Sequence, residues 1–314
     1  MPHPNGYNLI QHAVRIIEVG PRDGLQHEPN LVPTEAKVRF IDALSRTGLS
    51  EIEIGSFVSS SAVPQLADTD EVVRLIERRP GVIYSGLVPN ERGLERAIRA
   101  GLKKIAVFTA TSDAFTRRNI NCTVLESMER FKPVLSGAKR NGMLVRGYIS
   151  TVTHCPFDGP IPPKRVLEVL HRLLELGVDE LSLGETLGKA VPADVRKLLD
   201  EVLPVIPATG LSLHFHDTYG TAVANVLTAW NEYGIEAFDT SAGGLGGCPF
   251  APGASGNAAT EDVVYALKAS GAHVTVDERQ VVGAVRRMEP WLNHPLQSRL
   301  SHVSQPQTAC EGVT

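Results

Sequence analysis

Apolar residues along this chain recur with helical spacing in long segments that alternate with short runs rich in β-branched residues. Seven of the long segments end in a glycine shortly before such a run, and glycine is favoured there because a left-handed turn costs it no Cβ clash. With one further run near the N-terminus, the pattern predicts eight strands, at residues 14–20, 51–57, 82–88, 103–109, 144–150, 179–185, 211–217 and 236–242.

The intervening segments carry the signals of helices. A helix is expected over residues 33–47, Thr123 and Glu126 form a capping box that opens another, and residues 163–176 carry an apolar stripe. Strict alternation of strand and helix predicts a parallel sheet, and eight units favour its closure into a (β/α)8 TIM barrel. An open doubly wound sheet is the alternative, although no glycine fingerprint of a dinucleotide site follows the first strand.

The length of 314 residues fits one such barrel. We expect residues 1–297 to form a single catalytic barrel with a C-terminal helical extension. Residues 298–314 are polar, and we expect them to form a loosely ordered tail.

Charge and composition narrow the range of partners. The net charge of −4 comes without a basic tract, which argues against nucleic-acid binding. No apolar run approaches the roughly 18 residues of a membrane span, and the N-terminus lacks the apolar stretch of a signal peptide. Four cysteines without paired spacing fit a reducing compartment. A cytoplasmic protein without a nucleic-acid or membrane partner is therefore expected.

Polar residues at the ends of the predicted strands point to a metal site. Residues two apart in a strand face the same side, so His214 and His216 both face the barrel axis at its catalytic end. Asp23 and Asn257 follow neighbouring strands in a closed barrel. One carboxylate, one amide oxygen and two imidazoles suit Mg²⁺ or Mn²⁺ better than structural zinc. Two hydrogen-bonded core histidines remain the alternative.

Three further residues allow two interpretations each. Arg22 is permanently charged, so it is suited to clamp a developing oxyanion, or to pair with Glu53 or Glu185 at the barrel mouth. Glu53 is expected to face inward and Glu51 outward. Cys248 lies in a glycine-rich segment, where its thiol is either a proton donor in a mobile loop or an inert packing group.

At these residues the chain resembles the 3-hydroxy-3-methylglutaryl-CoA lyase family, from about residue 14 to 271. The resemblance rests on EVGPRDGLQ (18–26), SFV (56–58), VPQ (63–65), FTRRNINC (115–122), RGYIS (146–150), HFHDTYG (214–220) and GLGGCPFAPGASGNAATEDVVY (244–265). The last motif is the most specific, because it joins a cysteine loop to an asparagine ligand. The RDG and HxH elements alone are shared with isopropylmalate synthases and pyruvate-carboxylating domains.

The resemblance implies a role for each candidate residue. The metal ligands would be Asp23, His214, His216 and Asn257. Catalysis would involve Arg22 as the enolate-stabilising arginine, Cys248 on a mobile loop, Glu53 as an active-site carboxylate, and His214 or Asp23 as the base. The remaining roles, near the acyl-CoA or the acid, would fall to Ser56, Asn119, Gln26 and Glu185.

The implied reaction is a retro-Claisen cleavage that gives a keto acid and acetyl-CoA. The chain departs from the family pattern at four places, all in strand ends or the loops after them. Glu185 stands where Asp is usual, His27 replaces Asn, Ser60–Ser61–Ala62 replaces Pro-Lys-Trp, and Ala190–Val191–Pro192 replaces Gly-Thr-Pro after Lys189.

These departures leave the acyl group open. A related tertiary 3-hydroxyacyl-CoA, such as citramalyl-CoA or a longer-chain homologue, would use the same residues. A Claisen-type synthase of acyl-CoA and 2-keto acid, and a metal-binding barrel without turnover, are further alternatives. The family resemblance also implies a homodimer and a part in leucine degradation.

Overall fold

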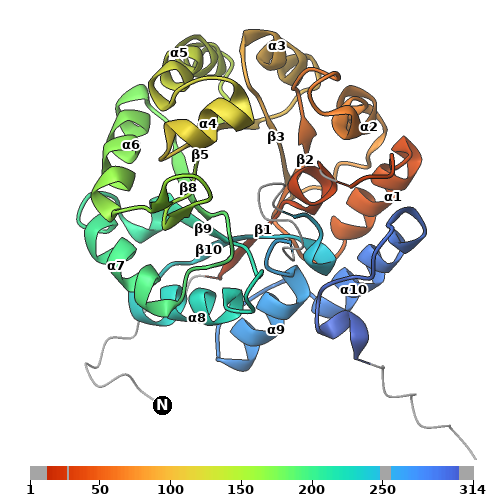
Figure 1. The fold of residues 1–314 in the computed structure, drawn as a ribbon. Helices are drawn as coiled ribbons and strands as arrows, with labels where there is room; N and C mark the ends of the chain where they lie inside the picture. The colour runs from red at the N-terminus through yellow and green to blue at the C-terminus, as the bar shows by residue number, and fades with distance from the viewer. Residues whose placement is uncertain (1–12, 27, 248–255, 304–314) are drawn as a thin grey trace, which may run out of the picture.

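The structure is a computed structural model in which residues 13–26, 28–247 and 256–303 are described. Its main feature is a closed barrel of eight parallel strands, joined in the order β1-β10-β9-β8-β5-β4-β3-β2 (Figure 1). Helices form a ring around the barrel, as expected when every strand is followed by a crossover helix. The predicted (β/α)8 barrel is confirmed, and closure excludes the open doubly wound alternative.

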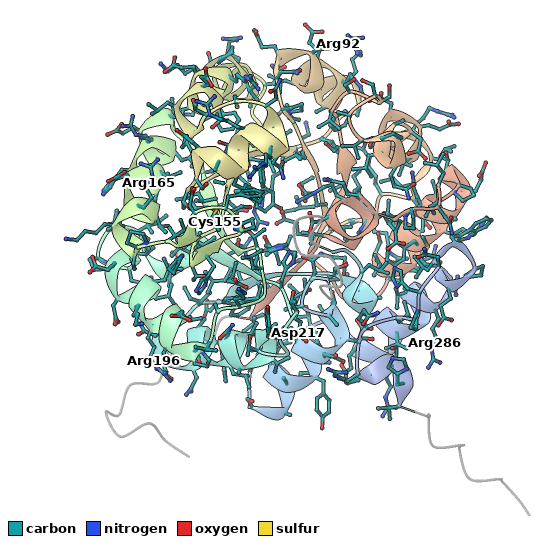
Figure 2. All side chains as sticks on the ribbon, in the orientation of Figure 1. Arg92, Cys155, Arg165, Arg196, Asp217 and Arg286 are labelled. Atoms are coloured by element: carbon teal, nitrogen blue, oxygen red, sulfur yellow. The ribbon has the colours of Figure 1, made fainter. Side chains whose placement is uncertain are left out.

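All eight predicted strands are present, and each end lies within two residues of its expected position. The barrel strands are β1 Arg15–Glu18, β2 Glu51–Ser56, β3 Ile83–Leu87, β4 Lys104–Ala110, β5 Leu144–Ser150, β8 Glu180–Glu185, β9 Leu211–Phe215 and β10 Ala237–Thr240. The sequence pattern missed a two-residue hairpin, β6 His154–Cys155 with β7 Gly159–Pro160, which is too short to show periodicity. Cys155 of this hairpin lies inside the ring of helices, whereas Arg92, Arg196 and Arg286 point outward from it (Figure 2).

The helices follow the strands in the expected alternation. They are α1 Thr34–Leu44, α2 Thr69–Leu75, α3 Glu91–Arg99, α4 Asp113–Ile120, α5 Val124–Arg140, α6 Pro163–Leu176, α7 Pro192–Val202, α8 Ala222–Tyr233, α9 Thr260–Ala269 and α10 Glu278–Arg286. The predicted extension contains α10, which packs against α1 and α9. No helix in the described parts of the chain is long and apolar enough to cross a membrane.

Helix ends show where local sequence signals were sufficient. Thr123 caps α5 as predicted, since its side chain accepts from the Glu126 amide while Glu126 bonds back to the Thr123 amide. Gly177 ends α6 with φ +85°, a conformation that favours glycine. Gly210 differs: α7 ends earlier, at Val202, and Gly210 belongs to a 3-10 turn that leads into β9.

The barrel interior is charged at the end where the strands begin. Lys104 lies between Glu51 and Glu180, with its Nζ at 2.8 Å and 2.5 Å from their carboxylate oxygens. Arg146 also pairs with Glu180, at 2.5 Å. The prediction that Glu51 faces outward is therefore wrong. Residues two apart in a strand share a face, so Glu51 lies inside the barrel together with Glu53.

The segment predicted as a loose tail begins against the barrel. Ser298 is fully buried, and the backbone amides of Arg299 and Leu300 donate to the Asp262 carboxylate at the start of α9. A 3-10 turn follows at Leu300–His302. The backbone of this segment is therefore held by the start of α9, and residues 304–314 lie outside the described part of the chain.

Candidate metal centre and active site

Three of the predicted ligands meet at the end of the barrel where the strands finish. Asp23 lies in a π-helical turn, Gly20–Gly24, directly after β1, while His214 and His216 lie at the end of β9. One ligand atom from each of the three lies within 4.8 Å of the other two. The two imidazole rings are 5.2 Å apart between centroids and tilted by 47°, so they converge without stacking.

Asn257 joins this group from the segment after β10. Its Nδ2 donates to Asp23 Oδ2 and to the Leu245 carbonyl, each at 3.0 Å, and its backbone bridges to His216. Within the described residues, its buried Oδ1 has no hydrogen-bond partner. An orphaned buried acceptor is costly, and a cation near Asp23 and the two histidines would satisfy it. The residues present therefore fit a divalent ion held by oxygen and imidazole ligands.

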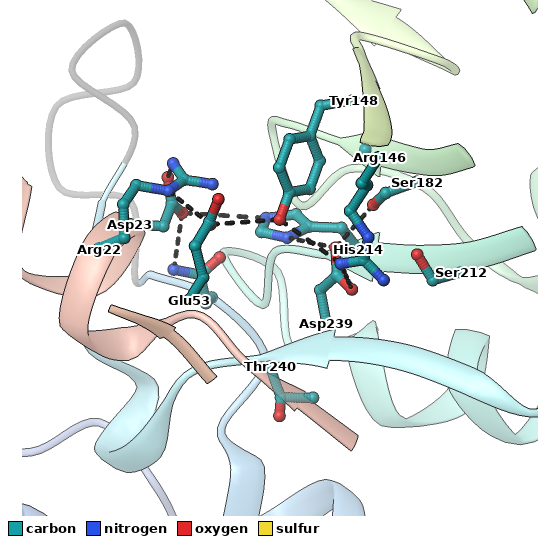
Figure 3. A network of polar contacts seen from close by, with 12 residues as sticks. Arg22, Asp23, Glu53, Arg146, Tyr148, Ser182, Ser212, His214, Asp239 and Thr240 are labelled. Carbon is teal, nitrogen blue, oxygen red and sulfur yellow. Dashed lines mark hydrogen bonds and ion pairs between the residues drawn. The ribbon is translucent and has the colours of Figure 1, made fainter. Parts of the chain in front are cut away.

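Arg22 sits beside this group and is fixed by two carboxylates. Its Nε donates to Glu53 Oε2 at 2.7 Å and its Nη1 to Asp23 Oδ1 at 2.5 Å (Figure 3). Its guanidinium also lies over the Tyr148 ring, 5.4 Å from the centroid. The predicted ion pair between Arg22 and Glu53 is present. The two carboxylates also hold the Arg22 guanidinium next to the metal-ligand group.

Burial and charge set the protonation states around Arg22. Burial alone would raise the pKa of the Asp23 carboxyl, but the Arg22 guanidinium brings that pKa well below its usual value. Burial raises the pKa of Glu53 although Arg22 opposes the change. Burial also raises the pKa of Tyr148 well above its usual value, so its hydroxyl stays protonated and donates to Glu53 at 3.2 Å. Asp23 is thereby kept anionic, as a cation ligand must be.

A cavity of about 630 Å³ opens above these residues, which is a typical size for a ligand site. Arg22, Asp23, His214 and His216 line its floor. Of the residues predicted to bind substrate or coenzyme, Gln26 and Asn119 line it as well. The rest of the lining mixes apolar side chains, among them Val63, Leu87, Val88, Phe108, Phe115, Ile120 and Phe131, with polar ones, among them Asn90, Asn121, Ser127 and Arg130.

Other predicted residues lie behind this lining. Glu185 Oε1 accepts from the Thr153 hydroxyl at 3.3 Å and the Lys189 amide at 3.2 Å, so the carboxylate anchors the loop after β8. The Ser56 amide donates to Thr69 Oγ1, and Ser56 is buried beside the cavity wall. His27 and Cys248 lie outside the described residues, although Gly247 next to Cys248 lines the cavity. The roles predicted for these residues stay predictions.

Two residues close to the ligand group had not been singled out from the sequence. Tyr148 lines the cavity between Arg22 and His214, and Asp239 lies 3.8 Å from His214 Nδ1. In each strand an adjacent residue, Ile149 or Phe238, is apolar and fully buried, so the polar side chain faces the opposite side. A polar side chain in such a strand has to point into the barrel, which was a usable signal for both.

Comparisons with known proteins identify the family. The HMGL-like family model matches residues 13–287. A rat protein named 3-hydroxy-3-methylglutaryl-CoA lyase, cytoplasmic, is 50% identical over 88% of this chain and 80% of its own length. A Pseudomonas aeruginosa protein named 3-hydroxy-3-isohexenylglutaryl-CoA/hydroxy-methylglutaryl-CoA lyase is 48% identical over 89% of this chain and 93% of its own.

A solved structure adds a ligand-bound relative. An Acinetobacter baumannii HMG-CoA lyase in complex with coenzyme A and 3-methylmalate superimposes with a TM-score of 0.90 and 36% identity, covering 98% of this chain and all of that one. Other relatives are named as mitochondrial forms, so the names do not decide the location of this chain. The chain belongs to the HMGL-like family, as its motifs predict.

Proposed function

We propose that this protein is a divalent-metal-dependent carbon–carbon lyase that cleaves 3-hydroxy-3-methylglutaryl-CoA to acetoacetate and acetyl-CoA. The observation that carries the proposal is the convergence of Asp23, His214 and His216 beside Arg22 on the floor of the cavity. A Claisen-type synthase is the less favoured reading, since the comparisons above that reach high identity are with proteins named as lyases.

The side chains can be assigned to the steps of a retro-Claisen cleavage. A Mg²⁺ or Mn²⁺ held by Asp23, His214, His216 and Asn257 would polarise the tertiary hydroxyl of the substrate. His214 or Asp23 takes the proton from that hydroxyl, and the electron pair of the C2–C3 bond passes into the thioester as an enolate. Arg22, held by Glu53 and Asp23, stabilises the enolate oxygen. The Cys248 thiol protonates the enolate carbon, which gives acetyl-CoA.

A longer substituent on C3 of the substrate is a second candidate. Apolar side chains such as Val88, Phe108 and Phe131 line part of the cavity, and the Pseudomonas relative is named for an isohexenyl substrate as well as the methyl one. An apolar chain would gain about 0.8 kcal/mol for each CH₂ buried there. Asn119 and Gln26 would then contact the polar parts of the acyl-CoA.

A substrate panel tests both candidates. The apo-protein is assayed with Mn²⁺ or Mg²⁺ and three thioesters: the methylglutaryl, isohexenylglutaryl and citramalyl esters of CoA. We expect cleavage of the methylglutaryl ester that is abolished by EDTA and restored by metal. A kcat/KM that is much higher for citramalyl-CoA would overturn the assignment of the acid. Mn²⁺ binding without cleavage of any ester would leave a metal-binding barrel instead.

Assembly and location belong to this proposal too. We expect a homodimer in the cytoplasm, and analytical ultracentrifugation and cell fractionation test the two expectations.

A further inference from the structure

We propose that Asp239 is a positioning residue that orients His214, so that this histidine presents Nε2 rather than Nδ1 to the metal. The inference rests on the metal centre proposed above. It concerns a side chain below the ligand group, inside the barrel, that does not line the cavity.

His214 stands between two carboxylates. Its Nε2 lies 4.0 Å from Asp23 Oδ2, on the cavity side, and its Nδ1 lies 3.8 Å from Asp239 Oδ2, on the interior side (Figure 3). His214 and Asp239 are also Cα partners across β9 and β10. The pairing of β9 with β10 therefore holds these two side chains side by side, whether or not a ligand occupies the cavity.

Asp239 is held from two other strands. Arg146 Nη1 donates to its Oδ1 at 2.9 Å, and the Ser182 hydroxyl donates to its Oδ2 at 2.6 Å. The carboxylate is only 1% exposed, so water does not compete for it. Two donors fix its plane and leave the remaining acceptor capacity of Oδ2 for His214.

The Nδ1 atom of His214 needs such a partner. It is buried, and no hydrogen-bond partner for it occurs in residues 13–26, 28–247 or 256–303. A small rotation of the ring would bring Nδ1–H within hydrogen-bond range of Asp239. A carboxylate that accepts from one ring nitrogen fixes the tautomer and increases the basicity of the other, which is how metal-binding histidines are generally supported.

This arrangement narrows the mechanism. With Nδ1 bonded to Asp239 and Nε2 directed at the metal, His214 has no lone pair left to take the substrate proton. Of the two candidate bases, Asp23 then remains.

The test compares two carboxylates that share Arg146. Asp239→Asn replaces the charged carboxylate next to His214 by a neutral amide, which is a weaker acceptor, whereas Glu180→Gln removes the other carboxylate bound to Arg146 without touching His214. Mn²⁺ affinity of each apo-protein is measured by electron paramagnetic resonance, and thermal unfolding serves as the control for folding. We expect Asp239→Asn to weaken Mn²⁺ binding by roughly 10-fold or more and Glu180→Gln to change it by less than about 2-fold.

The outcomes separate the inference from the proposal beneath it. If the wild-type protein binds no Mn²⁺, the metal centre itself is wrong. If it binds Mn²⁺ and Asp239→Asn binds equally well, or Glu180→Gln loses as much, the positioning role is wrong. Should Asp239→Asn not fold, Ser182→Ala removes the donor that orients Oδ2. It is expected to weaken binding by about 3-fold, and unchanged affinity in that variant would overturn the inference.

Discussion

The two ends of the barrel interior differ in how their charges are satisfied. Where the strands begin, Lys104 touches both Glu51 and Glu180 at ordinary ion-pair distances. Where the strands end, His214 Nε2 lies 4.0 Å from Asp23 Oδ2, and one ligand atom each of Asp23, His214 and His216 lies within 4.8 Å of the other two. The first group is closed on itself, and the second leaves a point between its members that a cation can fill. The ion-paired group around Lys104 therefore suits a structural role, and the separated ligand atoms of Asp23, His214 and His216 suit the binding of a cation.

The largest effect is expected at the spaced end. His214→Ala removes one imidazole from the ligand group, so Mn²⁺ binding should be lost and kcat/KM should fall by roughly 1000-fold or more. The midpoint of thermal unfolding of the metal-free protein should change little, because His214 lines the cavity and its loss enlarges an existing opening rather than a closed core. Near-wild-type turnover in this variant would show that His214 is a core histidine.

The closed end should respond in the opposite way. Lys104→Met leaves the buried Glu51 and the partly buried Glu180 without their shared ammonium group, which should lower the free energy of unfolding by about 3 kcal/mol. Mn²⁺ affinity and turnover per folded molecule should stay within about 2-fold of the wild type, because no atom of Lys104 reaches the ligand group. Urea unfolding and Mn²⁺ titration measure the two quantities, and a loss of affinity would break the distinction between the two ends.

Arg22 shares a feature with each end of the barrel. It is ion-paired, as Lys104 is, and it also faces the cavity, as the metal ligands do. Arg22→Gln should lower kcat by about 100-fold with little change in KM, because the charge it stabilises develops only in the transition state. Steady-state kinetics with the methylglutaryl ester measure both constants. An effect confined to KM would mean that Arg22 grips the ground-state substrate instead.

The fold was largely predictable because each signal was local. Glycine after a helix, as at Gly177, and the capping box at Thr123 depend only on neighbouring residues. Eight repeats of the same unit then leave few ways to close a parallel sheet. The missed hairpin and the early end of α7 are features of loops, where tertiary contacts decide the backbone.

The metal group was predictable for a related reason. The His214–His216 spacing fixes a shared face, and barrel closure brings Asp23 and Asn257 to the same end. The direction of Glu185 was not predictable, because its carboxylate turns toward the amides of its own loop rather than the cavity. The inward direction of Glu51 was predictable, because residues two apart in a strand share a face and Glu53 faces inward.

The smallest expected effect concerns Glu18, a buried acid for which the described residues provide no cation partner of the kind that Glu51 has. It accepts from the Gly20 and Ala242 amides and from the Thr260 hydroxyl, behind the turn that carries Asp23. Burial raises its pKa to about 7, which these hydrogen bonds only partly oppose. The folded state therefore binds the proton more tightly than the unfolded chain, whose glutamate titrates near 4.3.

The stability that Glu18 contributes is thus fully present below about pH 4 and is lost as the pH rises through about 7. Between pH 5 and pH 8 its contribution should fall by about 2.5 kcal/mol. Glu18→Gln keeps the neutral shape, so the difference in unfolding free energy between mutant and wild type should favour the mutant increasingly from pH 5 to pH 8. Urea unfolding at several pH values measures this difference. A difference in unfolding free energy that stays constant from pH 5 to pH 8 would mean that Glu18 is already ionised in the folded protein. Its hydrogen-bond donors would then stabilise the charge, as Lys104 does for Glu51.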